Sequence, residues 1–134
     1  MCDEKKTVVP RARVSDTISL EGLQFFTLIG DLPHERTTPQ PLELDVEVRT
    51  DLARAGRSDS LADSLDYRLL YRAVAGAVED QAEGAPHLLE AIAERVAGRL
   101  LALEGVASVR VRCRKPKAVL PGPVAKVEIQ IERP

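Results

Sequence analysis

Four stretches of the chain alternate between hydrophobic and polar residues, which is the pattern of half-buried β-strands. In residues 42–49, leucines and valines take every second position and charged residues take the others. Residues 109–114 and 127–132 alternate in the same way. Residues 18–29 are also largely apolar at alternate positions, but Glu21-Gly22 interrupts them and predicts a bulge or a kink. The pattern therefore predicts four strands that pair in an antiparallel sheet.

The spacing of apolar residues predicts two helices between the second and third strands. Apolar residues recur at intervals of three and four over residues 67–81, and again in the segment that ends at Gly105. Gly84 separates the two helices, and Pro86 suits the first turn of the second one. Residues 51–66 are mostly polar and are expected to be a connecting segment. The order β-β-α-α-β-β is typical of an α+β fold, a four-stranded antiparallel sheet with two helices on one face.

The remaining segments concern the ends and edges of this domain. Residues 1–15 mix charges with a proline and lack a period, so we expect a flexible N-terminal arm followed by a single domain over residues 16–134. Residues 115–123, KPKAVLPGP, predict a rigid connection between the last two strands. Four strands leave two sheet edges, and neither predicted edge strand contains proline. Such edges pair with other copies of a chain, so we expect a homo-oligomer.

Length and composition narrow the function classes. The chain has 134 residues, of which 44% are hydrophobic and 30% are charged, as in an ordinary globular domain. A net charge of −2 and only four aromatic side chains disfavour a nucleic-acid partner. The sequence contains no apolar run of membrane-spanning or signal-peptide length, so we expect a cytoplasmic protein without a membrane partner.

Several kinds of chemistry are excluded by the residues that the chain lacks. Cys2 and Cys113 lie at opposite ends of the sequence and cannot form a disulfide framework, and the parity of Cys113 with neighbouring valines predicts a buried core residue. His34 and His87 are the only histidines, so a His-rich zinc site cannot be assembled. The nucleophile motif GxSxG and the phosphate loops GxxxxGK[ST] and GxGxxG are absent.

Four places carry side chains that could do chemistry, and each also has a structural explanation. The turn GDLPHE, residues 30–35, holds a carboxylate and an imidazole, or is an ordinary polar loop. Tyr67 follows Asp66, a good N-cap, at the start of a helix. Glu90 lies in the opening turn of the second helix, where the helix dipole stabilises it in any case. Lys115 precedes a proline at a strand end, either as a functional amine or as part of a solvated basic turn.

The arginines of the third strand have a simpler explanation. Arg110, Arg112 and Arg114 share one face of the strand. Glu128 and Glu132 occupy the polar face of the fourth strand. Cross-strand ion pairs explain this row better than contacts with phosphate groups.

Taken together, the order and spacing of the four places resemble the dihydroneopterin aldolase family of the folate pathway. The resemblance covers nearly everything from Asp16 to Arg133. The matching stretches are DTISLEGLQFFTLIG with the loop to Glu35, PLELDVEV, SDSLADSLDY, LLEAIAERVA, RKPKAV and VEIQIER. The separation of 25 positions from Glu90 to Lys115 is part of the match. The segment EDQAEGAPH between the helices is a few residues longer than is usual in the family, so the resemblance does not predict the helix–helix loop.

The resemblance implies a fold, an assembly and a set of site residues. The family has the tunnelling fold, in which subunits join their antiparallel sheets into a barrel and two rings stack, typically as an octamer, with the active site at a subunit interface. Carried over by position, Glu90 anchors the pterin, with Leu89 contributing through its backbone. Glu35, Tyr67 and Lys115 surround the reacting side chain, and Lys115 serves as the principal acid and base.

The implied activity is that of an aldehyde-lyase without a cofactor. It cleaves 7,8-dihydroneopterin by a retro-aldol reaction to 6-hydroxymethyl-7,8-dihydropterin and glycolaldehyde, and epimerisation at C2′ is a related step. Because the ring imine of the pterin is itself the electron sink, the resemblance implies neither a metal nor a lysine Schiff base. Two alternatives stay open: a dihydroneopterin-triphosphate 2′-epimerase, which the Lys115-Pro116 pair resembles less well, and a non-catalytic pterin-binding oligomer of the same fold.

Overall fold

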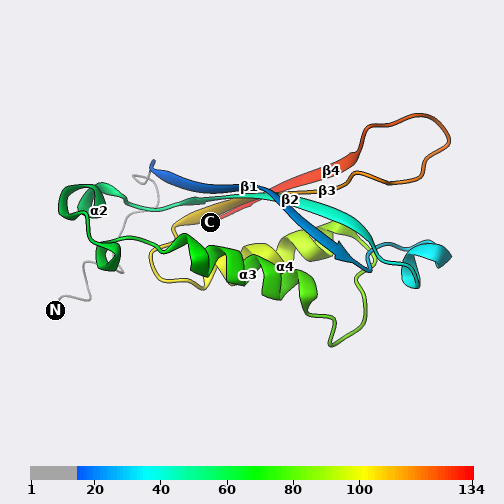
Figure 1. Ribbon diagram of the computed structural model, residues 1–134, viewed down its shortest axis with the longest axis horizontal. Coiled ribbons are helices and arrows are strands. Elements are labelled where there is room, and N and C mark those ends of the chain that lie inside the picture. Colours follow the sequence, from blue (N-terminus) through cyan, green and yellow to red (C-terminus); the bar gives the residue numbers. More distant parts are fainter. Residues whose placement is uncertain (1–14) are drawn as a thin grey trace.

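The described part of the chain, residues 15–134 of a computed structural model, is built in two layers, a sheet and a pair of helices (Figure 1). Apart from Ser15, the predicted arm of residues 1–15 lies outside the described residues. The elements are β1 (Thr17–Thr27), η2 (Pro33–Arg36), β2 (Gln40–Arg49), α2 (Ala53–Ser58), η3 (Leu61–Asp63), α3 (Tyr67–Glu79), α4 (Leu89–Leu101), β3 (Ser108–Lys115) and β4 (Val127–Arg133).

The sheet has the order β1-β2-β3-β4, and every neighbouring pair is antiparallel, which confirms the predicted α+β fold class. The predicted irregularity in the first strand is also confirmed. The register between β1 and β2 shifts between Leu20 and Leu23, where Gly22 adopts a φ of 70° that favours glycine. The Gly22 N–H donates to Asp45 Oδ1 across the strands at 2.7 Å. The bulge is thus held by a side chain of β2.

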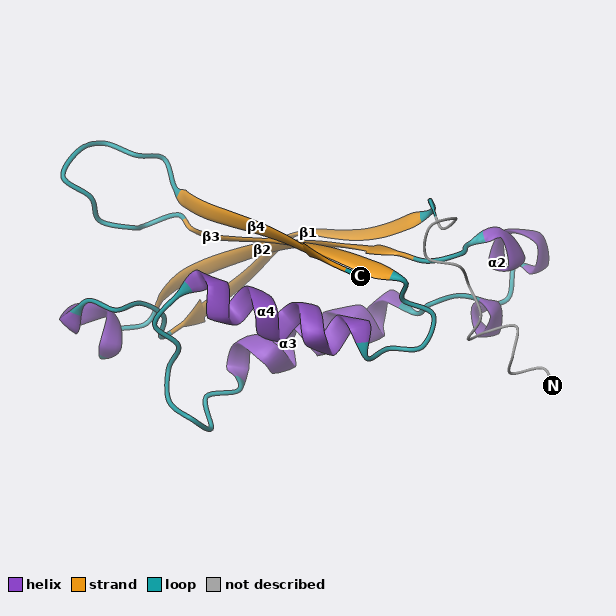
Figure 2. Ribbon diagram, turned by 180° about the vertical axis from the view of Figure 1, so that it is seen from behind, coloured by secondary structure: helices purple, strands orange, loops and turns teal. Residues whose placement is uncertain are grey.

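The core lies between the sheet and the helices α3 and α4, which cover one face of the sheet side by side (Figure 2). Alternate residues of β2 and β3 are fully or almost fully buried there, as the period-two pattern predicts. Cys113 is one of them, and burial raises the pKa of its thiol to about 12, so the prediction of a core cysteine is confirmed. On the edge strands β1 and β4, most apolar side chains are only half-buried, and Phe26 of β1 is exposed.

The helix-free face of the sheet carries cross-strand ion pairs, as predicted for the arginines of β3. Arg110 Nε lies 2.9 Å from Glu132 Oε2, and Arg114 Nη1 lies 3.4 Å from Glu128 Oε1. The expectation named only acids of β4, whereas Arg114 Nη1 is closer, at 3.0 Å, to Asp45 Oδ2 on β2. The hydrogen bond from Arg114 is the main reason why the pKa of Asp45 falls to about 2. Strand β3 therefore pairs its charges on both sides.

Three predictions about segments were wrong, and each has a physical reason. The first strand was expected to reach Ile29, but β1 ends at Thr27, and the Ile29 carbonyl accepts a hydrogen bond from a side chain instead of a strand. The segment 51–66 was expected to be a plain connection, yet it contains α2 and η3, which bury no residue and so leave no hydrophobic period. Pro86 was placed in the first turn of the second helix, but α4 begins at Leu89 because the Pro86 carbonyl is bonded to another loop.

Candidate active site

A nearly buried carboxylate lies in the loop between β1 and β2. Glu35 is 6% exposed and is the third residue of η2, which Pro33 opens with its fixed φ. Three donors converge on its carboxylate: the Leu32 N–H on Oε1 at 3.2 Å, and Gln40 Nε2 and Lys115 Nζ on Oε2 at 3.0 and 2.9 Å. These contacts bring Glu35 and Lys115, which are 80 residues apart in the sequence, into one ion pair.

The surroundings of Glu35 determine its ionisation. Burial by itself would raise the pKa of this carboxyl group, because the charged form loses hydration. Hydrogen bonds from Gln40, Lys115 and Leu32, together with the positive charge of Lys115, outweigh that effect and lower the pKa from 4.5 to about 2. Glu35 is therefore a carboxylate at neutral pH, and its charge is matched by donors on both oxygens.

Gly30 allows the Glu35 side chain to pack against the backbone of its own loop. Its φ is +133°, which disfavours any residue with a side chain. A Cβ at this position would lie 2.2 Å from the carboxyl carbon and from Oε1 of Glu35. The glycine is therefore required by a close approach, and that approach fixes where the carboxylate lies.

Lys115, the partner of Glu35, comes from a distant part of the sequence. It is the last residue of β3, which ends there because Pro116 has no N–H to continue the ladder. Its side chain is 14% exposed, and its ammonium group donates to Glu35. The amine is thus held at the end of a strand with a small part of its side chain exposed.

The start of α4 lies at the same end of the molecule. The Gly30 N–H donates to the Pro86 carbonyl at 3.1 Å, which ties the segment before α4 to the loop before η2. Leu89 opens α4 and is buried, whereas Glu90 is exposed. Burial is the main cause that raises the pKa of the Cys113 thiol, and the negative charge of Glu90 adds to it. Glu90 therefore lies near this end of β3. Its carboxylate is exposed and is available to a ligand.

Tyr67 is also a predicted site residue, but within one chain it does not lie near Glu35 and Lys115. Asp66 caps α3 as predicted, accepting a hydrogen bond from the Arg68 N–H at 2.9 Å. Tyr67 follows the cap and is 63% exposed. Figure 1 shows that α3 begins on the side of the molecule where α2 lies, away from η2. One chain therefore joins Glu35 and Lys115 directly, places Leu89 and Glu90 at the same end, and leaves Tyr67 away from them.

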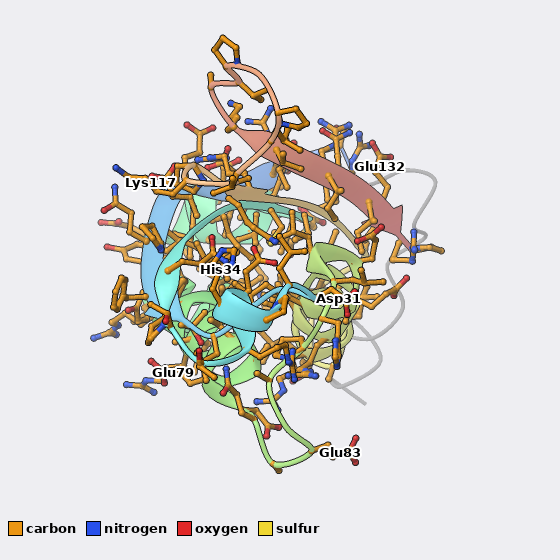
Figure 3. All side chains as sticks on the ribbon, turned by 90° about the vertical axis from the view of Figure 1, so that its right-hand side faces the viewer. Asp31, His34, Glu79, Glu83, Lys117 and Glu132 are labelled. Atoms are coloured by element: carbon orange, nitrogen blue, oxygen red, sulfur yellow. The ribbon has the colours of Figure 1, made fainter. Side chains whose placement is uncertain are left out.

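Residues that the sequence did not single out also build this end. Gln40 holds the Glu35 carboxylate, and Arg36 donates to two backbone carbonyls of neighbouring loops. Figure 3 looks onto this end, with η2 and His34 near its centre, Asp31 beside them and Lys117 toward its edge. Both new residues lie in or next to the loop of residues 30–41, and only that proximity to Glu35 in the sequence could have suggested them.

The described residues show no arrangement for a metal or a membrane. In residues 15–134, no group of three or more His, Cys, Asp or Glu side chains is placed to hold a metal ion. None of the helices in that part of the chain is both long and apolar enough to cross a bilayer. This end of the described chain brings a lysine and its carboxylate partner together with an accessible glutamate.

Comparisons with known proteins agree on one family. The family model described as dihydroneopterin aldolase (FolB) matches residues 18–132. The dihydroneopterin aldolase of Bacillus subtilis (strain 168) is 32% identical over 120 residues, 88% of this chain and 97% of the relative. The structure of E. coli dihydroneopterin aldolase in complex with neopterin is 36% identical, covers 90% of this chain and 100% of its own, and has a TM-score of 0.81. The Burkholderia thailendensis dihydroneopterin aldolase bound to guanine is 28% identical, covers 92% and 94%, and has a TM-score of 0.74.

Proposed function

The chain belongs to the dihydroneopterin aldolase family, and on this premise we propose that Glu35, Lys115 and Glu90 form the site at which it cleaves 7,8-dihydroneopterin. The observation that carries the proposal is the contact between Lys115 Nζ and the nearly buried Glu35 carboxylate at 2.9 Å. A lysine held in this way, beside an exposed glutamate at a helix start, supplies a proton-transfer group and an anchor. The retro-aldol reaction needs both.

Glu90 is the proposed anchor for the pterin ring. A carboxylate can accept two parallel hydrogen bonds from the 2-amino group and the N3–H of a pterin. The first backbone N–H groups of α4, beginning at Leu89, have no partner within the helix and can donate to the ring carbonyl. Neopterin in the E. coli structure and guanine in the Burkholderia structure share that amino-pyrimidinone edge, which supports a ligand of this class for the present chain.

Lys115 is the proposed acid and base. Removal of the proton from the 2′-hydroxyl allows the C1′–C2′ bond to break, and its electrons pass into the ring imine at N5 and C6. Glycolaldehyde leaves and an enamine remains, and protonation at C1′ then yields 6-hydroxymethyl-7,8-dihydropterin. One amine that takes a proton and returns one is sufficient for both transfers. The ionised Glu35, held by Gln40, fixes where that amine lies.

The position of Tyr67 bears on the assembly. Because α3 begins on the side of the molecule away from η2, the tyrosine of one subunit can join the Glu35–Lys115 pair only in another subunit. The half-buried apolar side chains on the edge strands β1 and β4 support pairing of sheets between copies. We therefore propose a ring-based homo-oligomer, an octamer as is typical of the family, with Tyr67 completing the site across an interface. The cytoplasmic location expected from the sequence stays a prediction.

One assay tests the reaction. Purified protein is incubated with 7,8-dihydroneopterin, and the product mixture is analysed for glycolaldehyde and 6-hydroxymethyl-7,8-dihydropterin. We expect both products in equal amounts, and we expect turnover to survive exhaustive chelation because the substrate supplies its own electron sink. A mixture that contains only the C2′ epimer would favour the epimerase, and unreacted substrate would favour the non-catalytic binding oligomer. Loss of activity that added zinc restores would contradict the metal-free mechanism.

Light scattering tests the assembly in the same preparation. A stable multimer at micromolar concentration is the expected result. A stable monomer that turns over substrate would contradict a site completed by Tyr67 of a neighbouring subunit.

A further inference from the structure

Arg36 joins two loops that carry different parts of the site. It follows Glu35 directly and ends η2, and its side chain is half-buried. Its Nη1 donates to the Gly30 carbonyl at 3.0 Å and to the Pro86 carbonyl at 3.2 Å. Gly30 and Pro86 are both buried, so these carbonyls need partners within the protein.

The two loops position the groups that are proposed to contact the two ends of the substrate. One loop, residues 30–36, carries Glu35, which holds the acid–base lysine. The other loop follows α3 and leads into α4, where Glu90 lies four residues after Pro86. The Gly30 N–H also donates to the Pro86 carbonyl at 3.1 Å, so that carbonyl accepts from the backbone and from the guanidinium at once. Hydrogen bonds from a charged donor are stronger than those between neutral groups, and they also fix the relative positions of the two partners.

Two other side-chain contacts join these segments. Gln81 Nε2 donates to Thr27 Oγ1 at 3.0 Å and to the Leu28 carbonyl at 3.2 Å, but Gln81 lies just after α3, farther from Glu90 in the sequence than Pro86 is. His87 Nδ1 lies 2.9 Å from Asp31 Oδ1, but the two side chains are 58% and 78% exposed. An exposed pair of this kind contributes little to holding a loop. The guanidinium of Arg36 is thus the charged group that ties Pro86, close to the start of α4, to the loop that carries Glu35.

We propose that Arg36 is a positioning residue for the aldolase reaction, because it sets the distance between the Glu35–Lys115 pair and the pterin anchor at Glu90. The inference rests on the proposed function. Arg36 does not act on the substrate itself. When it is removed, the pterin still binds at the start of α4, but its C2′ hydroxyl no longer meets Lys115 in the reactive geometry. Misplacement by about 1 Å is enough to slow a positioned reaction by about 10²-fold.

The experiment compares Arg36→Met with wild type in two measurements. Single-turnover rates are normalised to the number of pterin sites, which fluorescence titration with a pterin analogue provides. We expect the rate per site to fall by about 10- to 100-fold while affinity changes by no more than about threefold. Hydrogen–deuterium exchange of residues 28–32 and 84–91 is expected to rise in the same variant, since the Gly30 N–H shares its acceptor with Arg36.

Two further variants separate positioning from a general loss of structure. Arg36→Lys retains a charged donor that can bridge the two carbonyls, so it should recover part of the rate. Arg95→Met is the matched control, because Arg95 Nη1 also bridges two carbonyls, those of Ala77 and Asp80, at the end of α3. It should lower stability without lowering the rate per site.

The outcomes distinguish this inference from the proposed function. If wild type forms glycolaldehyde and Arg36→Met keeps its rate per site, the positioning role is wrong and the function stands. An equal loss of rate per site in Arg36→Met and Arg95→Met would also overturn it, since the effect would then be one of stability. If wild type forms no glycolaldehyde, both proposals fail together.

Discussion

The two ends of the sheet differ in how they hold their functional side chains. At the end with η2, Glu35 is 6% exposed, and three donors bind its carboxylate. Close packing against Gly30 fixes the position of the Glu35 side chain. At the end where α3 begins, Tyr67 is 63% exposed and follows a helix cap. The acid–base pair is thus complete within one chain, whereas the tyrosine is displayed on a surface. Under the proposed function, the geometry is built in where proton transfer is proposed to occur, and the exposed group is the one proposed to be supplied to another copy.

Removal of Lys115 tests the built-in end most strongly. In Lys115→Ala we expect turnover to fall by about 10²- to 10⁴-fold, since a positioned proton-transfer group is lost. Pterin affinity should change much less, because the proposed anchor of the ring is Glu90. Single-turnover rates and a fluorescence titration measure the two effects. Lys117→Ala is the control, an exposed lysine two residues further along. Near-normal turnover in Lys115→Ala would show that the acid–base assignment is wrong even within the right family.

Removal of Glu90 tests the anchor at the same end. A charge-assisted pair of hydrogen bonds contributes roughly 2–4 kcal/mol, so Glu90→Ala should weaken pterin binding by about 30- to 1000-fold. Titration with a pterin analogue measures this loss. The control is Glu104→Ala, an exposed glutamate after α4. If Glu90 is only a solvated helix-start residue, both changes will stay within about 0.5 kcal/mol of stability and binding will be unaffected.

Mixed oligomers test whether the two ends meet across subunits. Tyr67→Ala and Lys115→Ala chains, each nearly inactive alone, are co-expressed in equal amounts. If one site takes its lysine and its tyrosine from different chains, about a quarter of the sites in a random mixture are intact. Activity should then recover by about 10²-fold over either variant. Co-assembled chains that stay as inactive as the separate variants would place both residues in one chain and break the comparison.

The pH dependence of stability sharpens the contrast between the two ends. The pKa of Glu35 falls from 4.5 to about 2 on folding, so its ionised form stabilises the native state above about pH 4.5, and this contribution is lost as pH falls toward about 2. Denaturant titrations should show that wild type loses about 2–3 kcal/mol more than Glu35→Gln across that window. Asp45, whose pKa also falls to about 2, contributes equally in both proteins. The free energy of unfolding of Tyr67→Phe should depend on pH as that of wild type does. If Glu35→Gln also shows the wild-type pH dependence, the ion pair does not stabilise the native state.

The sequence predicted the sheet well because a period of two has one physical cause. A strand with one buried face must alternate, and this placed β2, β3, β4 and the bulge at Gly22. The short helix α2 was missed because it buries no residue. Segment ends moved where a backbone carbonyl, such as that of Pro86, bonds to a distant loop. Such acceptors are present in every residue and carry no signature in the sequence.

The site was predicted unevenly for a related reason. Glu35 and Lys115 were placed together only through the family resemblance, because they are 80 residues apart and no local pattern joins them. Gln40 and Arg36 were missed because no sequence pattern indicates their hydrogen-bond acceptors. Gln40 donates to one carboxylate oxygen of Glu35, and Arg36 donates to two main-chain carbonyls. The role of Tyr67 stays a prediction, since its proposed partners lie in another molecule.

The bulge at Gly22 has a consequence for how copies of the chain can add to one another. A strand at the edge of a sheet offers a row of free N–H and C=O groups, and a long, straight row lets strands add without limit, as in a fibril. In β1 the register shifts between Leu20 and Leu23, and the Gly22 N–H points to Asp45. A bulge bends and twists its strand, so the outer edge of β1 is not one straight row. Such a bent edge hinders unlimited strand addition, which agrees with the closed ring proposed above.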